Sequence, residues 1–314
     1  METVRFRAMN TDILLAAEGQ ADRLPEGLAQ AERFLHASEA RFTRFSDESE
    51  LSALNRSAGR RFEASPDLFS VVALARHFFL LTGGLFNPSV LPDLKRVGYD
   101  RSIDEVREQG AAPLLDPVPS AGRISLNEIE LDEPNRTIRL PAGMTIDLGG
   151  IAKGWIAEQA ALRLSKYAHA CAVNAGGDMF PVGLPEGRER WPVAMEDPLH
   201  PEVLLTSLLV GPGAVATSTI TKRTWQQGGK KRHHLIDPRT GEPAVTDWLS
   251  VTVIAPHGYE AEVFAKALLI AGPQDSERIA LGSGIPFSYL TVDRDLKIWG
   301  TQKSLEYIYV DTTG

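Results

Sequence analysis

The chain has 314 residues, of which 43% are hydrophobic and 24% charged, a composition typical of a globular protein with a large core. Its net charge of −8 argues against nucleic acid or an anionic membrane as the main partner, because phosphate backbones are bound by dense basic surfaces. No apolar run is long enough for a signal peptide or a membrane span, so we expect a cytoplasmic protein without membrane insertion. The one cysteine, Cys171, excludes an intramolecular disulfide and is expected to be a small buried hydrophobe.

Short sequence signals divide the first third of the chain into strands and helices. At Ser65 a serine cap followed by a proline is typical of a helix start, and a glycine pair is typical of its end. The elements predicted here are two strands within 4–18 with a turn at Asn10, a helix over 25–42, a short helix at the end of 43–56, and a helix from Ser65-Pro66 to Gly83-Gly84.

The rest of the chain alternates strands with glycine- and proline-containing turns. The predicted elements are a variable loop with short elements over 100–135, strands over 137–148, 169–178, 190–196, 203–210, 233–241 and 249–256, and helices over 151–168 and 259–273, the latter closed by Gly272-Pro273. Strands outnumber helices and often follow one another directly. We therefore expect an α+β fold with mixed, largely antiparallel sheets and packed helices, in a single domain over 1–314.

The stretch IDLGGIAKGW, residues 146–155, is the first candidate for a binding site. It is not a P-loop, because Lys153 precedes the glycine and no serine or threonine follows, and it also lacks the dinucleotide-binding spacing. A glycine pair between a strand and a helix presents backbone N–H groups at the positive end of the helix, which favours an anion. Lys153 would reinforce such a site and Asp147 would accept a hydrogen bond. Close packing of the strand on the helix is the alternative explanation.

Three further stretches have both a structural and a functional interpretation. The turn NAGGD (174–178) repeats the glycine pair, although glycine is also the ordinary residue of a tight turn. In HHLIDPRTGEP (233–243), two adjacent histidines on a strand would point to opposite faces, and DPRTG forms a turn; the basic run that precedes it suits a small anionic ligand. A triad of Ser218, His234 and Asp237 can be drawn, but it lacks a nucleophile elbow.

The order of the motifs is more specific than any one of them. The series MNTD, TRFSDESELSALN, TGGLFNPSVLP, IDLGGIAKG, NAGGD, ATST, HHLIDPRTGEP and SVTVIAP…AEVFAKAL spans residues 9–271. It resembles the ApbE family, the FAD:protein FMN transferases. The resemblance implies an α+β fold with FAD in a cleft between two lobes, and transfer of FMN from FAD to a threonine or serine hydroxyl of a flavoprotein with release of AMP. Family enzymes use Mg²⁺ for this phosphoryl chemistry.

The resemblance also implies which residues of this chain bind the flavin. By position, Met9 and Asn10 border the flavin, and Asn55 ends the block that closes over it. Pro88 and Leu91 fall in the segment that lines the isoalloxazine ring.

The nucleotide side of the site is implied by the glycine-rich stretches. The residues that match the nucleotide-contacting loop are Asp147, Gly150, Lys153 and Gly154, and those that match a second turn near it are Asn174, Gly176, Gly177 and Asp178. Thr217 and Ser218 match the start of a Thr-Ser-Gly block, whose glycine is Thr219 here. His234 matches the histidine associated with catalysis.

Thr219 is one departure from the family pattern, and the helix predicted over 259–273 contains a second. The family presents an aspartate and, four residues on, a threonine as metal ligands, whereas this chain has Glu262 and Lys266. Glutamate has oxygen donors, but a protonated lysine has no lone pair for a metal. We therefore expect the Lys266 ammonium to take part of the metal's space and charge, so that FAD binds without Mg²⁺ or the metal binds through Glu262 and a backbone carbonyl. The alternative is an ordinary surface ion pair at i,i+4.

Two other functions stay open at this stage. An FAD-binding protein without transfer activity would act as a carrier or regulator, which the lysine at 266 favours. An FAD pyrophosphate hydrolase would use water in place of the protein hydroxyl. Retention of His234 favours catalysis, and the acceptor protein cannot be named from the sequence.

Overall fold

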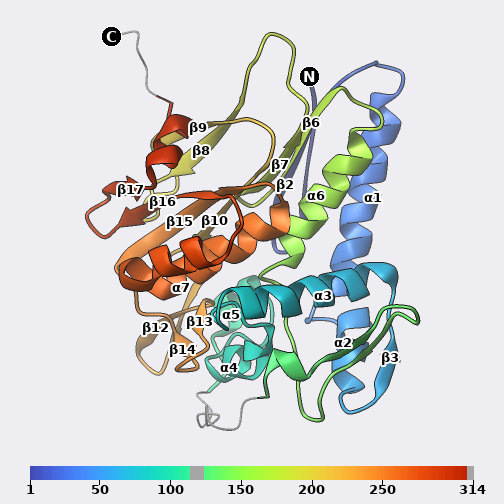
Figure 1. Ribbon diagram of the computed structural model, residues 1–314, viewed down its shortest axis with the longest axis vertical. Helices are drawn as coiled ribbons and strands as arrows, with labels where there is room; N and C mark the ends of the chain where they lie inside the picture. The colour runs from blue at the N-terminus through green and yellow to red at the C-terminus, as the bar shows by residue number, and fades with distance from the viewer. Residues whose placement is uncertain (114–123, 310–314) are drawn as a thin grey trace.

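A long antiparallel sheet forms the centre of the computed structural model, which describes residues 1–113 and 124–309 (Figure 1). Its eight strands follow, in order across the sheet, β1 (Glu2–Ala8), β2 (Thr11–Glu18), β6 (Ala170–Ala175), β7 (Asp178–Val182), β10 (Ala214–Thr219), β15 (Trp248–Ala255), β16 (Ser288–Asp293) and β17 (Ile298–Gly300). Every neighbouring pair in this order is antiparallel. The expected α+β fold with largely antiparallel pairing is confirmed.

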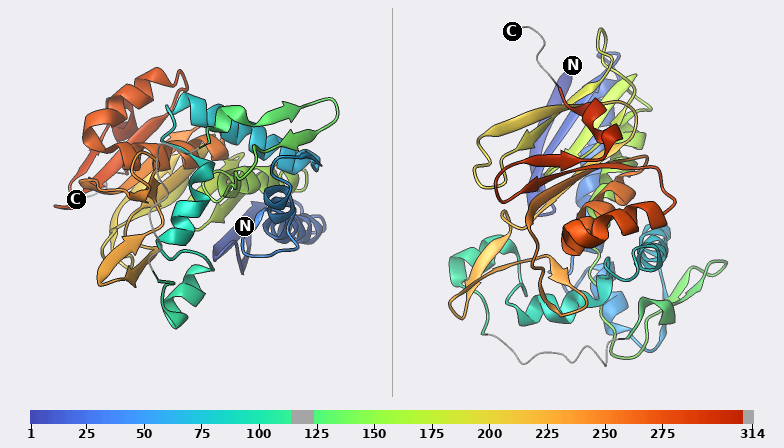
Figure 2. Two further views of the ribbon diagram at one scale, coloured as in Figure 1. Left: turned by 90° about the horizontal axis from the view of Figure 1, so that it is seen from below. Right: turned by 60° about the vertical axis from the view of Figure 1, so that its left-hand side comes forward.

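Helices cover one face of this sheet and a hairpin covers the other (Figures 1 and 2). The helices are α1 (Leu24–Phe42), α6 (Ala152–Leu164) and α7 (Gly258–Gly282), and the hairpin consists of β8 (Trp191–Glu196) and β9 (Leu204–Val210). Successive side chains of a strand point to opposite faces. In β15, Val253 accordingly packs in the main core with the helices, while Ile254 packs with Leu208 of the hairpin. All of β15 is buried, and its sequence is apolar except for Ser250 and Thr252.

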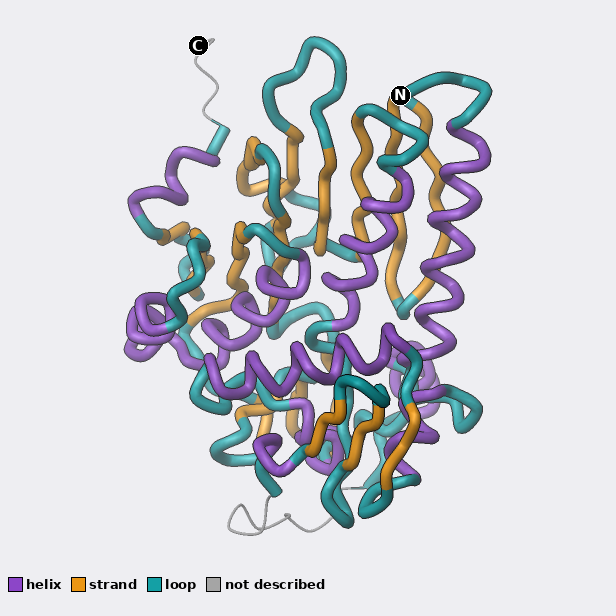
Figure 3. The backbone as a smooth tube through the Cα atoms, turned by 45° about the vertical axis from the view of Figure 1, so that its right-hand side comes forward, coloured by secondary structure: helices purple, strands orange, loops and turns teal. Residues whose placement is uncertain are grey.

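A second group of elements, the lower lobe, lies below the helices in Figure 1. It comprises α2 (Glu50–Arg56), β3 (Arg61–Glu63), α3 (Pro66–Leu81), α4 (Leu91–Arg96), α5 (Ile103–Gln109), β4 (Glu130–Asp132), β5 (Thr137–Arg139), β11 (Thr224–Gln227), β12 (Lys230–His233), β13 (Ile236–Asp237) and β14 (Glu242–Pro243), with 3₁₀ turns at Pro88–Val90 and Leu126–Glu128. A further 3₁₀ turn, Gln302–Tyr307, follows β17. Figure 3 shows α3 lying across the lower ends of α1 and α6. Within the lobe, the Trp225 indole donates to the Val97 carbonyl at 2.7 Å, which ties the β11–β12 hairpin to α4.

Two predicted elements end differently in the structure. The strand expected over 137–148 stops at Arg139, because the backbone beyond it is bonded elsewhere: the Asn55 amide pairs with both backbone groups of Ile146 at 2.9 Å, and the Asp147 N–H donates to the Pro88 carbonyl. The helix expected to close at Gly272 is interrupted there, at φ +70°, but helix resumes at once and continues to Gly282.

Other predictions hold in part. The segment 100–135 contains α5, a 3₁₀ turn and β4 as short elements, while residues 114–123 lie outside the described residues. Cys171 is buried in β6, and burial raises the pKa of its thiol to about 12. Over the two described ranges, no helix combines the length and apolar character needed to cross a bilayer. That the chain is one domain stays a prediction.

Candidate active site

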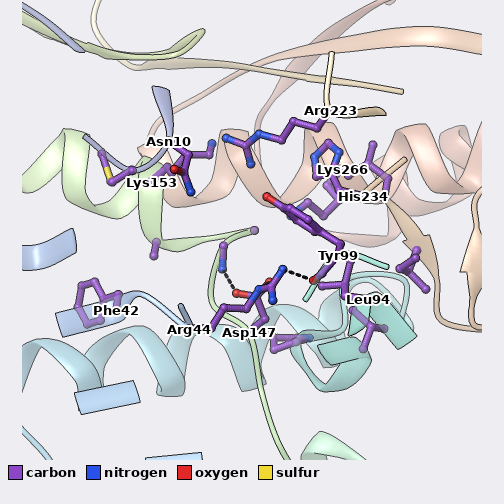
Figure 4. Close-up of a pocket in the computed structure, with 18 of the residues that line it drawn as sticks. Asn10, Phe42, Arg44, Leu94, Tyr99, Asp147, Lys153, Arg223, His234 and Lys266 are labelled. Carbon is purple, nitrogen blue, oxygen red and sulfur yellow. Dashed lines mark hydrogen bonds and ion pairs between the residues drawn. The ribbon is translucent and has the colours of Figure 1, made fainter. Parts of the chain in front are cut away.

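An open cavity of about 1050 Å³ lies where the lower lobe meets the helical layer (Figure 4). Its walls come from the β1–β2 turn, the end of α1 and the residues after it, the segment from Leu85 to Tyr99, the loop leading into α6, the region around β11–β13, and α7. Its lining combines apolar side chains with a few convergent polar groups, which is typical of small-molecule sites.

Eight of the residues singled out in the sequence line this cavity. They are Met9, Asn10, Pro88, Asp147, Gly150, Lys153, His234 and Lys266. Met9 and Asn10 form the β1–β2 turn with φ of 54° and 55°, and the Met9 N–H donates to Glu39 at 2.5 Å. Segments that are far apart in the sequence therefore meet at this cavity.

The other candidates are not among the residues that line the cavity. They are Asn55, Leu91, Gly154, Asn174, Gly176, Gly177, Asp178, Thr217, Ser218 and Glu262. Leu91 is buried at the start of α4, whereas Val90 and Leu94 face the cavity. Thr217 shares a hydroxyl hydrogen bond with Thr252 on the adjacent strand at 2.9 Å. Direct contact between these residues and a ligand stays a prediction.

Carboxylates accept hydrogen bonds from the glycine-rich stretch at the start of α6 and pair with its lysine. The Gly149 N–H donates to Asp147 at 3.0 Å, and the Gly154 N–H donates to Glu262 at 2.9 Å. The Lys153 ammonium pairs with Asp178 and, at 2.9 Å, with Glu262. Burial opposes the charged form of Lys153, but these two carboxylates raise its pKa. The loop alone is thus not the free anion site that its sequence indicates.

Behind the loop, α6 and α7 meet at two glycines. A Cβ on Gly154 would overlap the Gly258 carbonyl, and a Cβ on Gly258 would overlap the Gly154 carbonyl. One turn further along each helix is a glutamate that bonds the other helix: Glu262 accepts from the Gly154 N–H and Glu158 accepts from the Gly258 N–H, both at 2.9 Å. Each carboxylate satisfies a donor near a helix N-terminus, where negative charge is favoured.

The alternative explanation, a surface ion pair between Glu262 and Lys266, does not match the structure. Glu262 is only 3% exposed and its two oxygens bond Gly154 and Lys153, while Lys266 faces the cavity. Burial lowers the pKa of Lys266; Lys153 and Arg223 add to this effect, while the negative charges of Glu262 and Asp147 oppose it.

Replacing Glu262 by alanine should lower the free energy of unfolding by about 1–3 kcal/mol, because the buried Gly154 N–H and Lys153 each lose a partner. Urea unfolding monitored by circular dichroism measures this. Glu277→Ala, at an exposed position of the same helix, is the matched control and should change stability little. Equal stability of the two variants would contradict the assigned role of Glu262.

Two cavity residues that sequence reasoning missed are Arg44 and Tyr99. The Arg44 guanidinium lies over the rings of Phe45 and Tyr99, 4.2 and 4.6 Å from their centroids, and donates to the Tyr99 carbonyl at 2.8 Å. It also pairs with Asp147 at 3.5 Å. Its Nη1 is buried without a hydrogen-bond partner among the described residues. The only sequence signal was the position of Arg44 in the TRFSDES block.

A third missed residue is Arg223, in the loop before β11. It is half-buried and lines the cavity beside His234 and Lys266, opposite Arg44 and Asp147 across the Tyr99 ring (Figure 4). Within the described ranges, no carboxylate lies within 4 Å of its guanidinium. The basic run that was noted begins at residue 230, seven positions later, so composition gave no signal for Arg223.

His234 faces the cavity just after β12 ends at His233. Burial, with the positive charges of Arg223 and Lys266, lowers its pKa well below 6.5, so the imidazole is neutral at pH 7. Asp237 bonds Arg239 through both of its carboxylate oxygens. The described residues therefore do not form the Ser218–His234–Asp237 triad, and the Nδ1 of His234 has no protein partner among them.

Comparisons with known proteins identify the family. A family model described as the ApbE family matches residues 9–285. The chain belongs to the ApbE family. Two similar relatives are named FAD:protein FMN transferase. The one from Treponema pallidum is 32% identical over 73% of this chain and 67% of the relative, and the one from Klebsiella pneumoniae is 27% identical over 82% of this chain and 79% of the relative.

Solved ApbE structures share the fold. An ApbE protein from Thermotoga maritima superposes with a TM-score of 0.84 at 23% identity, covering 98% of this chain and 99% of that one. The flavin transferase ApbE from Vibrio cholerae gives a TM-score of 0.80 at 23% identity, with 98% and 99% coverage.

Proposed function

We propose that this ApbE-family protein is an FAD:protein FMN transferase, which moves FMN from FAD to a threonine or serine hydroxyl of a flavoprotein and releases AMP. The observation that carries the proposal is the cavity, where a neutral histidine lies beside two cations, Lys266 and Arg223. The transferase names of the relatives support it. Nothing in the comparisons favours a carrier or a hydrolase.

His234 is the proposed general base. The reaction forms a bond between the acceptor oxygen and the phosphorus of the FMN half, and breaks the bond from that phosphorus to the bridging oxygen, which leaves on AMP. The hydroxyl proton passes to the imidazole, which has a free lone pair because its pKa is low. A positioned base of this kind contributes roughly 10²- to 10⁴-fold to a rate.

Lys266 is the second proposed catalytic group. Negative charge develops on the transferred phosphoryl group and on the departing AMP, and fixed cations in a sheltered site stabilise it strongly. Burial lowers the pKa of Lys266, but a nearby pyrophosphate favours its ammonium form.

The proposed FAD-binding set combines residues of the cavity lining with residues outside it. It comprises Met9, Asn10, Asn55, Pro88, Leu91, Asp147, Gly150, Lys153, Gly154, Asn174, Gly176, Gly177, Asp178, Thr217 and Ser218. The lining members are proposed to contact FAD, and the others to hold them in place.

A resident Mg²⁺ does not fit the residues on α7. Magnesium prefers a shell of oxygen donors, but both oxygens of Glu262 are bonded to protein donors and the other family ligand position is Lys266. Within the described ranges, no group of three or more histidine, cysteine, aspartate or glutamate side chains is arranged to hold a metal. Binding of Mg²⁺ through Glu262 and a backbone carbonyl is therefore unsupported.

One assay tests the proposed function. The protein is incubated with FAD and a candidate flavoprotein acceptor, and AMP, free FMN and the acceptor mass are followed together. We expect equimolar AMP and FMN-modified acceptor, and no modification of an acceptor whose target threonine is replaced by alanine. AMP with free FMN would instead indicate a hydrolase, and bound FAD without either product a carrier. The cytoplasmic location stays a prediction.

A further inference from the structure

We propose that Lys266 and Arg223 hold the pyrophosphate of FAD in place of a divalent cation, so that FAD binding and FMN transfer by this chain do not depend on metal. The inference rests on the proposed function. It also assigns the side chains that compensate the negative charge of the pyrophosphate, and it names Arg223 as a binding residue.

The cations that line the cavity differ in whether a carboxylate pairs with them. Four lysine and arginine side chains of the described residues line it: Arg44, Lys153, Arg223 and Lys266. Asp147 pairs with Arg44, and Asp178 and Glu262 pair with Lys153. For Arg223 and Lys266, the described ranges contain no carboxylate within 4 Å. Glu39, which also lines the cavity, accepts from the Met9 N–H. Arg223 and Lys266 are therefore the two cations of the lining that are placed to pair directly with phosphate oxygens.

The Lys266 ammonium is close to Gly150. It lies directly against the backbone of the loop before α6, since a Cβ on Gly150 would overlap its Nζ. Gly150 thus leaves room for the ammonium where the chain enters the nucleotide-contacting loop. A divalent cation at the same place would be held beside a like charge, which costs free energy in a sheltered site.

Three polar side chains from separate elements meet in the cavity. Arg223, His234 and Lys266 come from the loop before β11, the end of β12 and α7, yet they lie on one side of the Tyr99 ring (Figure 4). Lys266 and Arg223 would therefore bind the phosphates within reach of the base. In the transfer step both cations stay bound to phosphate oxygens, and the proton from the acceptor goes to His234.

The test compares FAD binding, followed by flavin fluorescence, in excess EDTA and in millimolar Mg²⁺. We expect wild-type protein to bind equally well in both. Lys266→Thr should weaken binding in EDTA by about 10- to 100-fold, as expected for loss of one charge-assisted contact, and Mg²⁺ should restore part of it. Arg223→Gln, at a half-exposed position, should weaken binding to a similar extent. Lys231→Thr, on the exposed part of β12, is the matched control and should behave as wild type.

A second readout detects the metal directly. Electron paramagnetic resonance of Mn²⁺ should show no stoichiometric binding to the wild-type complex with FAD, and binding to the Lys266→Thr complex. Tenfold tighter FAD binding in Mg²⁺, stoichiometric Mn²⁺ on the wild-type complex, or unchanged affinity in both variants would overturn the inference while leaving the transferase intact. Failure of wild-type protein to bind FAD in either buffer would instead overturn the proposed function.

Discussion

Replacing His234 by glutamine should lower the single-turnover rate of FMN transfer by about 10²- to 10⁴-fold, the range for loss of a positioned general base. Glutamine keeps hydrogen-bonding capacity but cannot accept a proton at neutral pH. FAD affinity should change little, because the charge that binds the pyrophosphate comes from Lys266 and Arg223. Rapid-quench measurement of AMP and modified acceptor, with a separate FAD titration, distinguishes the two effects.

The neighbouring histidine provides the control. His233 points away from the cavity, and its Nε2 lies 3.1 Å from the Ala244 carbonyl. Burial lowers its pKa to about 4, so it is also neutral at pH 7. His233→Gln should leave the transfer rate near that of wild type. If both variants lost activity equally, the assignment of His234 as the base would be wrong.

The pH dependence of transfer should follow from the same histidine. The base must be neutral, and activity is lost as pH falls through its pKa. Burial and the adjacent cations lower the pKa of His234 well below 6.5, so the rate should stay flat from pH 8 to below pH 6.5 before it falls. Lys266→Met removes one of those cations, and the acid limb should move to higher pH. An acid limb at the same pH in wild type and Lys266→Met would contradict a charge interaction between the two groups.

Local patterns predicted the elements that depend on neighbouring residues. The helix expected over 25–42 is α1, and the serine cap expected at Ser65 is present, with its hydroxyl accepting from the Leu68 N–H at 3.2 Å. The order of the motifs identified the family and eight residues that line the cavity. The helix and its cap depend on residues that are close together in the sequence. The family was identified from the resemblance of the motifs to known sequences.

Contacts between distant segments could not be predicted in the same way. The spacing of Glu262 and Lys266 indicates an ion pair, but it says nothing about which side of the helix is buried. Glu262 instead bonds Gly154, 108 positions earlier in the chain. Arg223 acquires its role because α7 and β12 bring Lys266 and His234 beside it. Neither relation leaves a periodic signal in the sequence.

A substitution that disturbs the contact between α6 and α7 should strongly lower stability. Gly154→Ala should lower the free energy of unfolding by about 3 kcal/mol or more, although alanine favours helix by up to ~1 kcal/mol. The new Cβ overlaps the Gly258 carbonyl, and the helices must separate. Separation also weakens the hydrogen bonds that Glu262 and Glu158 make across the contact.

Gly282 offers a matched control on α7, because a Cβ there would meet no atom within 4 Å. Gly282→Ala should leave stability unchanged or raise it by up to ~1 kcal/mol. A double-mutant cycle adds a sharper test: Gly154→Ala and Gly258→Ala strain the same contact, so the double variant should cost less than the sum of the two. Additive costs would mean that the glycines act independently. Since α6 follows Gly150 and α7 carries Lys266, separation of the helices should also weaken FAD binding, whereas Gly282→Ala should not.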